Sequence, residues 1–209
     1  MKRVIWGRST SSNVRKVVWL LDELDLPYDR LDVGGEFGKT DTPHYRAMNP
    51  TGLVPTLQED EFTLFESNAI LRYLVDAYAP LSPYLPRDLR ARANVDRWMD
   101  FQQTVINRPQ TVVFLQLART APEKRDAGAL KAATAEAARG WAMVDTQLGK
   151  HAYVASDTFS LADICLGVHV HRWLNLPMEG RPELPNLAAW YQRLLQRPVY
   201  VQRCAGPIV

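Results

Sequence analysis

Two neighbouring segments in the first half of the chain constrain its fold more than any other feature. Residues 53–57 read LVPTL, a strand entered through a proline, and residues 64–70 read LFESNAI, a strand that ends where a polar triplet begins a helix. Proline has no backbone N–H and belongs at the start or edge of a strand. The backbone of Val54 is therefore left to pair with something other than a neighbouring strand. A helix that begins at Ser67 offers unpaired N–H groups to an anion. Together the two segments predict a surface that holds a short extended peptide carrying a carboxylate.

The residues around these segments alternate between strand and helix patterns. Residues 3–7 predict a short strand, and apolar residues at helical spacing predict a helix that runs to about residue 25. Strands joined through a helix pair in parallel, whereas hairpin strands pair antiparallel. This order predicts a thioredoxin-like domain with a mixed four-stranded sheet. Its remaining elements are strands over residues 28–33, 54–58 and 62–65, helical turns over 43–48, an acidic turn over 59–61 and a helix from Ser67.

The second half of the chain has a different pattern. Three prolines punctuate residues 80–88, which are predicted to form a linker, and no convincing strand pattern follows it. Ser160 and Asp163 are spaced as a capping box at the start of a helix. The expected fold class is therefore α/β followed by all-α, with a thioredoxin-like domain over residues 1–79 and an all-helical domain over 89–209. Helical stripes of apolar residues cover 95–106, 130–148 and 187–195.

Composition excludes several classes of partner. The chain has 25 Lys and Arg against 23 Asp and Glu, a net charge of +2, which gives no basic excess for nucleic acid. Residues 1–7 are too short for a signal peptide, and no run of about 18 apolar residues predicts a membrane span. Cys165 and Cys204 form no Cys-x-x-Cys pair, and Cys165 is expected to be a buried small hydrophobe. This cysteine usage fits a reducing cytoplasm. No metal is expected, because no ligand spacing links His151, His169 and His171.

Three motifs are more specific than these patterns. They are residues 49–55 (NPTGLVP), 66–70 (ESNAI) and 159–163 (FSLAD). In this order and spacing the chain resembles the glutathione transferase family over nearly its whole length. The resemblance implies the glutathione transferase fold. Some bacterial members act on small halogenated acids, and the chain looks like this bacterial group at residues 7–17, 36–38 and 117–120.

The resemblance implies a detoxification enzyme in which the sulfur of glutathione, a co-substrate, attacks a small electrophile. It also implies a homodimer. Two other hypotheses stay open: a glutathione-dependent reductase of disulfides or peroxides that lacks a protein thiol, and a non-catalytic interaction module. A pure scaffold needs neither residues 54–55 nor residues 66–67, which argues against the module. A maleylacetoacetate isomerase ranks low because its usual Ser-Ser-Cys segment is absent.

The turn over residues 9–13 is the expected place for the sulfur of glutathione. It follows the first strand and precedes the first helix. A hydroxyl or amide donor aimed at the sulfur favours the thiolate, and the amino end of a helix adds positive partial charge. By resemblance Ser11 is the first candidate, Asn13 the second and Thr10 the third. The alternative is that Ser11 or Ser12 merely caps the helix. The turn holds no Tyr or Cys, which disfavours a tyrosine mechanism and a mixed disulfide with the protein.

The resemblance also implies which residues bind the other parts of glutathione. The backbone of Val54, before a cis bond to Pro55, should pair with the cysteinyl part. Ser67 should bind the γ-glutamyl carboxylate and Glu66 the ammonium group. The alternatives are an ordinary edge-strand proline and a plain helix cap. Many relatives hold the glycine end with a Lys where this chain has Leu53, so the candidates here are Lys39 and His44, which would otherwise be solvated loop residues.

The electrophile is expected to sit between Arg8, Phe37 and the first long helix of the second domain. Arg108 and Arg119 would supply positive charge for an acidic substrate, although surface or interdomain ion pairs are the alternative for both. Asp163 is expected to be structural, because it caps a helix predicted to be buried.

Overall fold

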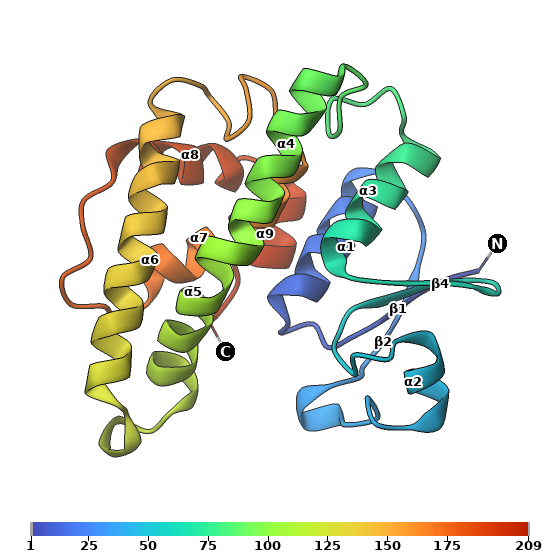
Figure 1. Ribbon diagram of the computed structural model, residues 1–209, viewed down its shortest axis with the longest axis horizontal. Coiled ribbons are helices and arrows are strands. Elements are labelled where there is room, and N and C mark those ends of the chain that lie inside the picture. Colours follow the sequence, from blue (N-terminus) through green and yellow to red (C-terminus); the bar gives the residue numbers. More distant parts are fainter. Residues whose placement is uncertain (1, 209) are drawn as a thin grey trace. The chain divides into compact units, whose positions relative to one another are not determined.

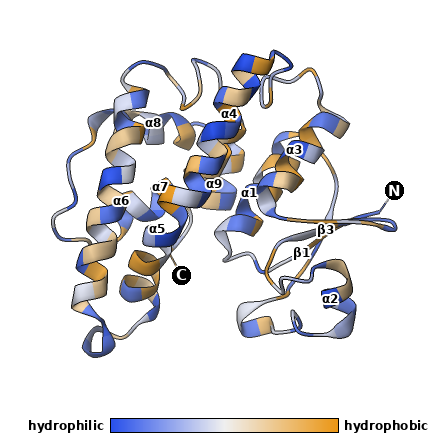
Figure 2. Cartoon of the chain, viewed as in Figure 1, coloured by the Kyte–Doolittle hydropathy of each residue, from blue (hydrophilic) through white to orange (hydrophobic). Residues whose placement is uncertain are grey.

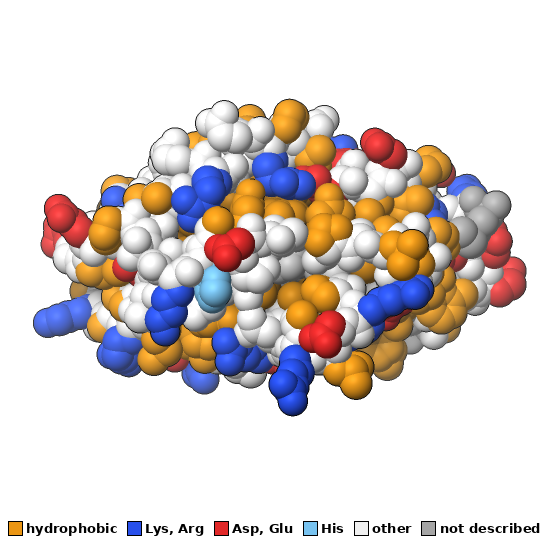
Figure 3. Space-filling view, turned by 90° about the horizontal axis from the view of Figure 1, so that it is seen from above, with side chains coloured by type: hydrophobic (Ala, Val, Ile, Leu, Met, Phe, Trp, Pro, Cys, Tyr) orange, Lys and Arg blue, Asp and Glu red, His pale blue; other side chains and the backbone are white. Residues whose placement is uncertain are grey.

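The computed structural model describes residues 2–208. Its contacts divide the chain into two compact units, the first ending at Leu85 and the second beginning at Pro86. The first unit mixes strands and helices, and the described residues of the second contain helices and no strand. The face drawn in Figure 3 shows Lys and Arg side chains interspersed with acidic and hydrophobic ones, without one large basic patch. Within residues 2–208, no helix is both long and apolar enough to cross a membrane.

The first unit is built on a four-stranded sheet in the order β2-β1-β3-β4. Strand β1 pairs with β2 in parallel, through the helix that joins them, and with β3 antiparallel. Strands β3 and β4 form the predicted antiparallel hairpin. The mixed thioredoxin-like sheet is therefore confirmed. The strand bounds are β1 Arg3–Trp6, β2 Asp29–Leu31, β3 Thr56–Glu59 and β4 Phe62–Phe65.

Three helices cover this sheet. Figure 1 shows α1 (Ser12–Glu23) and α3 (Ser67–Tyr78) on one side of the strands and α2 (Pro43–Met48) on the other. Figure 2 shows that α1 and α3 each carry hydrophobic and hydrophilic segments, as amphipathic helices do. Their apolar faces are buried in the core of the unit, which includes Val17, Leu21, Ile70 and Leu74. A short 3-10 turn over Gly35–Phe37 interrupts the loop that follows β2.

The structure corrects the predicted hairpin at both ends of β3. The strand begins at Thr56, so Val54 and Pro55 precede it and do not belong to it. Glu59 is the last residue of the strand and is 3% exposed, so it is not part of a solvated acidic turn. The turn is instead made at Asp60, whose φ is +48°. Strand β2 is also shorter than residues 28–33.

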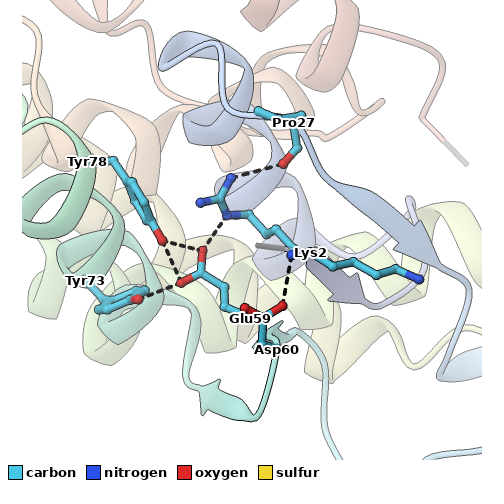
Figure 4. Close-up of polar contacts among 7 residues, drawn as sticks. Lys2, Pro27, Glu59, Asp60, Tyr73 and Tyr78 are labelled. Carbon is cyan, nitrogen blue, oxygen red and sulfur yellow. Dashed lines mark hydrogen bonds and ion pairs between the residues drawn. The ribbon is translucent and has the colours of Figure 1, made fainter.

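Glu59 is buried because it is the centre of a polar cluster with side chains from β1 and α3 (Figure 4). Its carboxylate accepts hydrogen bonds from Arg3 Nε at 2.6 Å, from the Tyr73 hydroxyl at 2.6 Å and from the Tyr78 hydroxyl at 2.9 Å. Arg3 Nη1 also donates to the carbonyl of Pro27 at 3.0 Å. The hydrogen bond to this carboxylate raises the pKa of Tyr73 above its ordinary value. The cluster ties β1, β3 and α3 together with its charge paired.

The second unit begins with one long, irregular run of helix. Two π-helical turns, Gln102–Ile106 and Leu115–Arg119, interrupt it. Trp141, Trp173 and Trp190 are fully buried in the core of the unit, and the rings of the first two stack at 6.3 Å. The helix predicted over residues 187–195 ends before Pro198, which begins a further short helix that was not predicted. The helix bounds are α4 Leu89–Phe101, α5 Asn107–Phe114, α6 Ala127–Leu148, α7 Leu161–Asn175, α8 Pro185–Leu195 and α9 Pro198–Cys204.

Candidate active site

The end of β1 and the first turn of α1 are fixed close to Val54. The N–H of Gly7 donates to the Leu31 carbonyl at 2.8 Å, and Arg15 Nε donates to the Ser9 carbonyl at 2.9 Å. A Cβ added at Gly7 would lie 2.4 Å from Val14 Cγ2 and 3.3 Å from Val54 Cβ. Only glycine allows this approach. It brings the turn over residues 9–13, where the sulfur of glutathione is expected (the sulfur turn), beside the backbone of Val54, which is expected to bind the peptide.

Ser11 is the N-cap of α1, and its hydroxyl oxygen accepts from the Val14 N–H at 3.4 Å. The alternative of a capping serine is therefore observed. Capping occupies a lone pair of the oxygen and not its hydrogen, so a hydroxyl in this position can still donate to a sulfur anion. The capping and catalytic interpretations of Ser11 are compatible.

Asn13 and Thr10 are half-buried beside Ser11. Asn13 Oδ1 is buried and has no hydrogen-bond partner among residues 2–208. An unsatisfied buried polar atom costs about 1–3 kcal/mol, so native structures rarely leave one without a role or a missing partner. The Asn13 oxygen is thus open to accept a hydrogen bond from another molecule at this turn.

Val54 has the backbone geometry that an added peptide requires. Its bond to Pro55 is cis, which confirms the expectation from the resemblance. Within residues 2–208, neither its N–H nor its carbonyl makes a hydrogen bond. The preceding Leu53 carbonyl is held by the Tyr45 hydroxyl at 2.6 Å and by Asn49 Nδ2 at 2.9 Å. Sequence reasoning did not single out these two anchors as positioning residues, although Asn49 stands in the quoted motif.

Glu66 is in an unusual conformation at the start of α3. Its φ is +69° and its ψ is 109°, it is exposed, and its side chain makes no capping hydrogen bond. A non-glycine residue held there costs about 1–3 kcal/mol, and such strain clusters at functional sites. Ser67 is the first residue of the helix, as predicted, and Glu66 is its N-cap. Ser67 itself is 2% exposed.

Lys16 is the functional candidate that sequence reasoning missed. It is 0% exposed, and its Nζ lies 3.4 Å from Ser67 Oγ and 3.2 Å from Asn68 Oδ1. A positive charge therefore stands at the N-terminus of α3, where the helix dipole already favours an anion. The signal in the sequence was a lysine directly before two apolar residues, at a position that an amphipathic helix buries.

These contacts define one site, called here the α1–α3 site. It consists of residues 10–13, Lys16, Val54, Glu66 and Ser67. Gly7 links its sulfur turn to Val54, and Lys16 links α1 to the start of α3. The site offers a hydroxyl, an amide, an open strand-like backbone and a buried cation, which together suit a short peptide with a thiol and a carboxylate.

The two candidates for binding the glycine end of glutathione lie on the loop after β2 and on α2. Lys39 is exposed with a φ of +69°, and its carbonyl accepts from the Thr42 hydroxyl at 2.9 Å. His44 is exposed, and its ring lies 5.6 Å from the ring of Trp6. Leu53, directly before Val54, is 67% exposed.

The predicted electrophile residues divide between the two units. Arg8 lies against the loop after β2, since a Cβ on Gly35 would be 3.0 Å from its Cδ and Nε, and Phe37 of that loop is 42% exposed. In the second unit Arg108 is exposed on α5, and the guanidinium of Arg119 lies 5.8 Å from the centre of the Phe114 ring.

Asp163 is the structural residue predicted from its capping box. Its Oδ2 accepts from the Ser160 N–H at 2.9 Å, and its Oδ1 accepts from the Val154 N–H at 3.0 Å and from Trp190 Nε1 at 2.9 Å. The carboxyl is fully buried, and this burial raises its pKa to about 6. Asp163 thus fixes the start of α7 and does not face a substrate.

The remaining sequence candidates have internal partners. His169 Nε2 lies 2.9 Å from Gln102 Nε2, and His171 Nδ1 lies 2.7 Å from the Tyr191 hydroxyl. In the described part of the chain, no three His, Cys, Asp or Glu side chains gather as a metal-binding group. Both cysteines are buried and unbridged, as expected for Cys165.

Comparisons with known proteins agree with this geometry. The glutathione S-transferase N-terminal domain model matches residues 10–77, and the C-terminal domain model matches residues 127–193. Glutathione S-transferase GstB of Escherichia coli K12 is 38% identical over 196 residues, 93% of each chain. Glutathione S-transferase F13 of Arabidopsis thaliana is 27% identical over 99% of this chain and 96% of its own.

A solved structure is similar over almost all of its length. The theta class glutathione S-transferase of the citrus canker pathogen Xanthomonas axonopodis pv. citri, with glutathione bound, is 41% identical. The match covers 99% of each chain at a TM-score of 0.94. The chain therefore belongs to the glutathione S-transferase family, as an enzyme of the transferase class. The fold expected from the resemblance is confirmed.

Proposed function

We propose that the α1–α3 site binds glutathione and directs its thiolate at small electrophiles, halogenated acids included. The observation that carries the proposal is the set of backbone and side-chain groups left open there. The Val54 backbone and Asn13 Oδ1 lack partners among residues 2–208, and both lie at the first turn of α1 or beside it. Glutathione supplies a peptide unit for the first and N–H donors for the second.

The γ-glutamyl end belongs at the start of α3. Its carboxylate would accept from the Ser67 hydroxyl and from the first N–H groups of the helix, with Lys16 adding charge from behind. The exposed Glu66 carboxylate would pair with the ammonium group. The unusual backbone of Glu66 fits this role, because it turns the chain into the helix while keeping the side chain in solvent. Lys39 or His44 would hold the glycine end.

The chemistry is a displacement at carbon. The Ser11 hydroxyl or the Asn13 amide donates to the sulfur, which favours the thiolate over the thiol, and the thiol proton passes to solvent. The sulfur then forms a bond to the carbon that carries the halogen, and halide leaves with the bonding electron pair. In the first unit, Arg8 would face the carboxylate of an acidic electrophile, and Phe37 its apolar part.

We further propose that the enzyme works as a cytoplasmic homodimer in detoxification. Large apolar side chains are exposed just after α3 and at the start of α4, where Leu81 is 83% and Leu89 is 80% exposed. Such residues are often covered in an oligomer. Sedimentation of the purified protein tests the dimer, and a monomer at micromolar concentration would contradict it.

The central test is turnover by single variants in the sulfur turn. We expect Ser11→Ala or Asn13→Ala to lower kcat by about tenfold or more, which is about 1.4 kcal/mol of barrier. Each is measured with a haloacid, an aryl halide and a mixed disulfide. Ser9→Ala is the matched control, because Ser9 is exposed and uses its carbonyl to hold Arg15.

The outcomes separate the alternatives. If both variants keep full activity, the sulfur is held elsewhere and this assignment is wrong. Turnover of the mixed disulfide alone would favour the glutathione-dependent reductase. The pH profile of kcat/KM should move to higher pH in the variant that has lost the sulfur contact, because the bound thiol then ionises less readily.

A further inference from the structure

Leu53 is an exposed apolar side chain that the proposed glutathione chemistry does not use. It stands directly before Val54, whose backbone groups are left open within residues 2–208. We propose that Leu53 selects the third residue of the peptide thiol and favours an apolar side chain there over the bare glycine of glutathione. Leu53 can act in this way only if the cysteinyl residue pairs with Val54, so this proposal rests on the function proposed above and extends it.

The direction of the bound peptide follows from the places of its first two residues. Strands β3 and β4 are paired up to the end from which α3 begins, which is also the end that follows Pro55. The start of α3, with Ser67, therefore lies on the Pro55 side of Val54. A peptide whose γ-glutamyl group is held there, and whose cysteinyl residue pairs with Val54, runs antiparallel to residues 53–55. Its third residue then lies opposite Leu53.

Antiparallel pairing brings opposed side chains close together. A hydrogen-bonded pair at Val54 is followed by a non-hydrogen-bonded pair at Leu53, in which the two Cα atoms are about 4.5 Å apart. Opposed side chains point to the same face, so the side chain of the third residue would lie beside that of Leu53. Glycine has no side chain to place there. Glutathione therefore leaves Leu53 uncovered, and a peptide with an apolar third residue covers it.

The side chain of Leu53 is directed away from the core of the first unit. Its neighbour Val54 packs inward, since an added Cβ would lie 3.3 Å from Val54 Cβ at Gly7 and 3.2 Å from Val54 Cγ1 at Gly34. Successive side chains of an extended segment point to opposite faces. The exposure of Leu53 agrees with this alternation and leaves its side chain accessible to a ligand.

The backbone of Leu53 is held on both sides, so its side chain is presented in a fixed place. The carbonyl accepts from the Tyr45 hydroxyl and from Asn49 Nδ2, and both of these residues are buried. The N–H donates to Thr51 Oγ1 at 3.1 Å. A ligand that covers Leu53 would not have to order this segment first, which lowers the cost of binding.

Arg46 supports the turn that precedes Leu53. Its Nη1 donates to the Pro50 carbonyl at 2.7 Å, and its guanidinium lies against Gly52, where an added Cβ would be 2.6 Å from Cζ. Gly52 has a φ of +67°, which glycine adopts without strain. These contacts hold the backbone in the conformation that presents Leu53.

The position of Leu53 distinguishes it from other exposed apolar residues. Single exposed leucines are common on protein surfaces, so exposure by itself indicates no function. At Leu53, however, pairing at the adjacent residue would bring the next side chain of the ligand into contact. Burial of apolar surface is favourable in proportion to the area removed from water. We therefore expect the affinity to rise with the apolar area of the third residue.

The test compares four peptide thiols on the full-length protein by calorimetric titration. Each is γ-glutamylcysteine joined to a third residue, which is glycine, alanine, valine or threonine. We expect the Kd to fall about fivefold from glycine to valine, with alanine between them. Threonine has nearly the shape of valine but carries a hydroxyl in place of one methyl group. Its peptide should bind about threefold more weakly than the valine peptide.

Variants of Leu53 assign the preference to this side chain. Leu53→Asn replaces the apolar surface with a polar group of similar size, and the valine and threonine peptides should then bind about equally. Leu53→Met keeps an apolar side chain and should keep the preference for valine. Met143→Ala is the control, because Met143 is another exposed apolar side chain, on α6 of the second unit. It should leave the ratio of the two affinities unchanged.

Three results would overturn the proposal. They are equal affinities of wild type for the valine and threonine peptides, tighter binding of glutathione than of the valine peptide, and an unchanged preference for valine in Leu53→Asn. In each of these cases glutathione still binds, and the function proposed above stands. Failure of all four peptides to bind would contradict that function and this proposal with it, so the two kinds of failure are distinguished by one set of titrations.

Discussion

The α1–α3 site and the capping box of α7 differ in whether their polar groups have hydrogen-bond partners. At the α1–α3 site Asn13 Oδ1 lacks a partner among the described residues, and Glu66 is held at positive φ. At the capping box, Asp163 receives hydrogen bonds from Ser160, Val154 and Trp190. A protein leaves polar groups open and backbone strained where a ligand completes them. It satisfies them where their purpose is to hold the fold.

The largest expected effect concerns the capping box of α7 and is seen in how the stability of the protein depends on pH. In the unfolded chain the carboxyl of Asp163 ionises near its ordinary pKa of 3.8, and burial raises its folded pKa to about 6. Between these values the folded state binds more protons than the unfolded state, so its stability falls as pH rises. The stabilisation that Asp163 contributes to the folded state is fully present below about pH 4. Above about pH 6 it is lost, which lowers the free energy of unfolding by roughly 3 kcal/mol.

Urea unfolding of wild type and Asp163→Asn between pH 4 and 7 measures this slope. We expect the decline from about pH 4 to about pH 6 to be smaller in the variant by roughly the same 3 kcal/mol. Glu136→Gln, at an exposed acid of α6, is the control and should keep the wild-type slope. Identical slopes in wild type and Asp163→Asn would mean that Asp163 does not titrate as its burial requires.

The second prediction concerns the buried cation of the α1–α3 site. Lys16→Met keeps the length of the side chain and removes its charge next to Ser67. We expect the Kd for glutathione to rise about tenfold, or about 1.4 kcal/mol. Calorimetric titration measures it.

A glutathione analogue without the γ-glutamyl carboxylate is the control for this effect. It should bind wild type and Lys16→Met equally, because the charge of Lys16 then has no anion to favour. An equal loss for glutathione and the analogue would show that Lys16 supports the fold and not the carboxylate.

The smallest expected effect concerns the strained backbone at Glu66. Glu66→Gly and Glu66→Ala both remove the carboxylate, but only glycine adopts the φ of +69° without strain. We expect Glu66→Gly to be more stable than Glu66→Ala by about 1 kcal/mol in thermal or urea unfolding. Both substitutions should weaken the binding of glutathione by similar factors. Equal stability of the two variants would show that the conformation of Glu66 is not strained.

Much of the fold could be predicted because it depends on local sequence. Helix α2 and strand β4 have the predicted bounds, and the Ser160–Asp163 box begins α7 as expected. Caps, prolines and apolar spacing act over a few residues, so they can be interpreted without knowing what packs against them. The cis bond before Pro55 came from the resemblance and not from local physics.

The misplaced features depend on neighbours that are distant in the sequence. Glu59 was assigned to a turn, because three acids in a row are typical of one, but Arg3 and two tyrosines from other elements bury it in β3. Lys16 was noted only as part of a motif, because its contacts with α3 are made some fifty residues away. The short helix α9 was missed because Pro198 both ends one helix and begins another.

The sequence by itself determined most of the segments that become strands and helices, and its motifs indicated the family. Periodicity, proline and capping residues act on adjacent backbone and need no tertiary context. Only the tertiary structure decided which polar groups are satisfied. Asn13 and Asp163 are both short polar side chains in the first turn of a helix, yet one is left with an open oxygen and the other is enclosed by donors. That difference arises because the partners of a buried polar atom come from elements that folding brings together, and local sequence does not encode them.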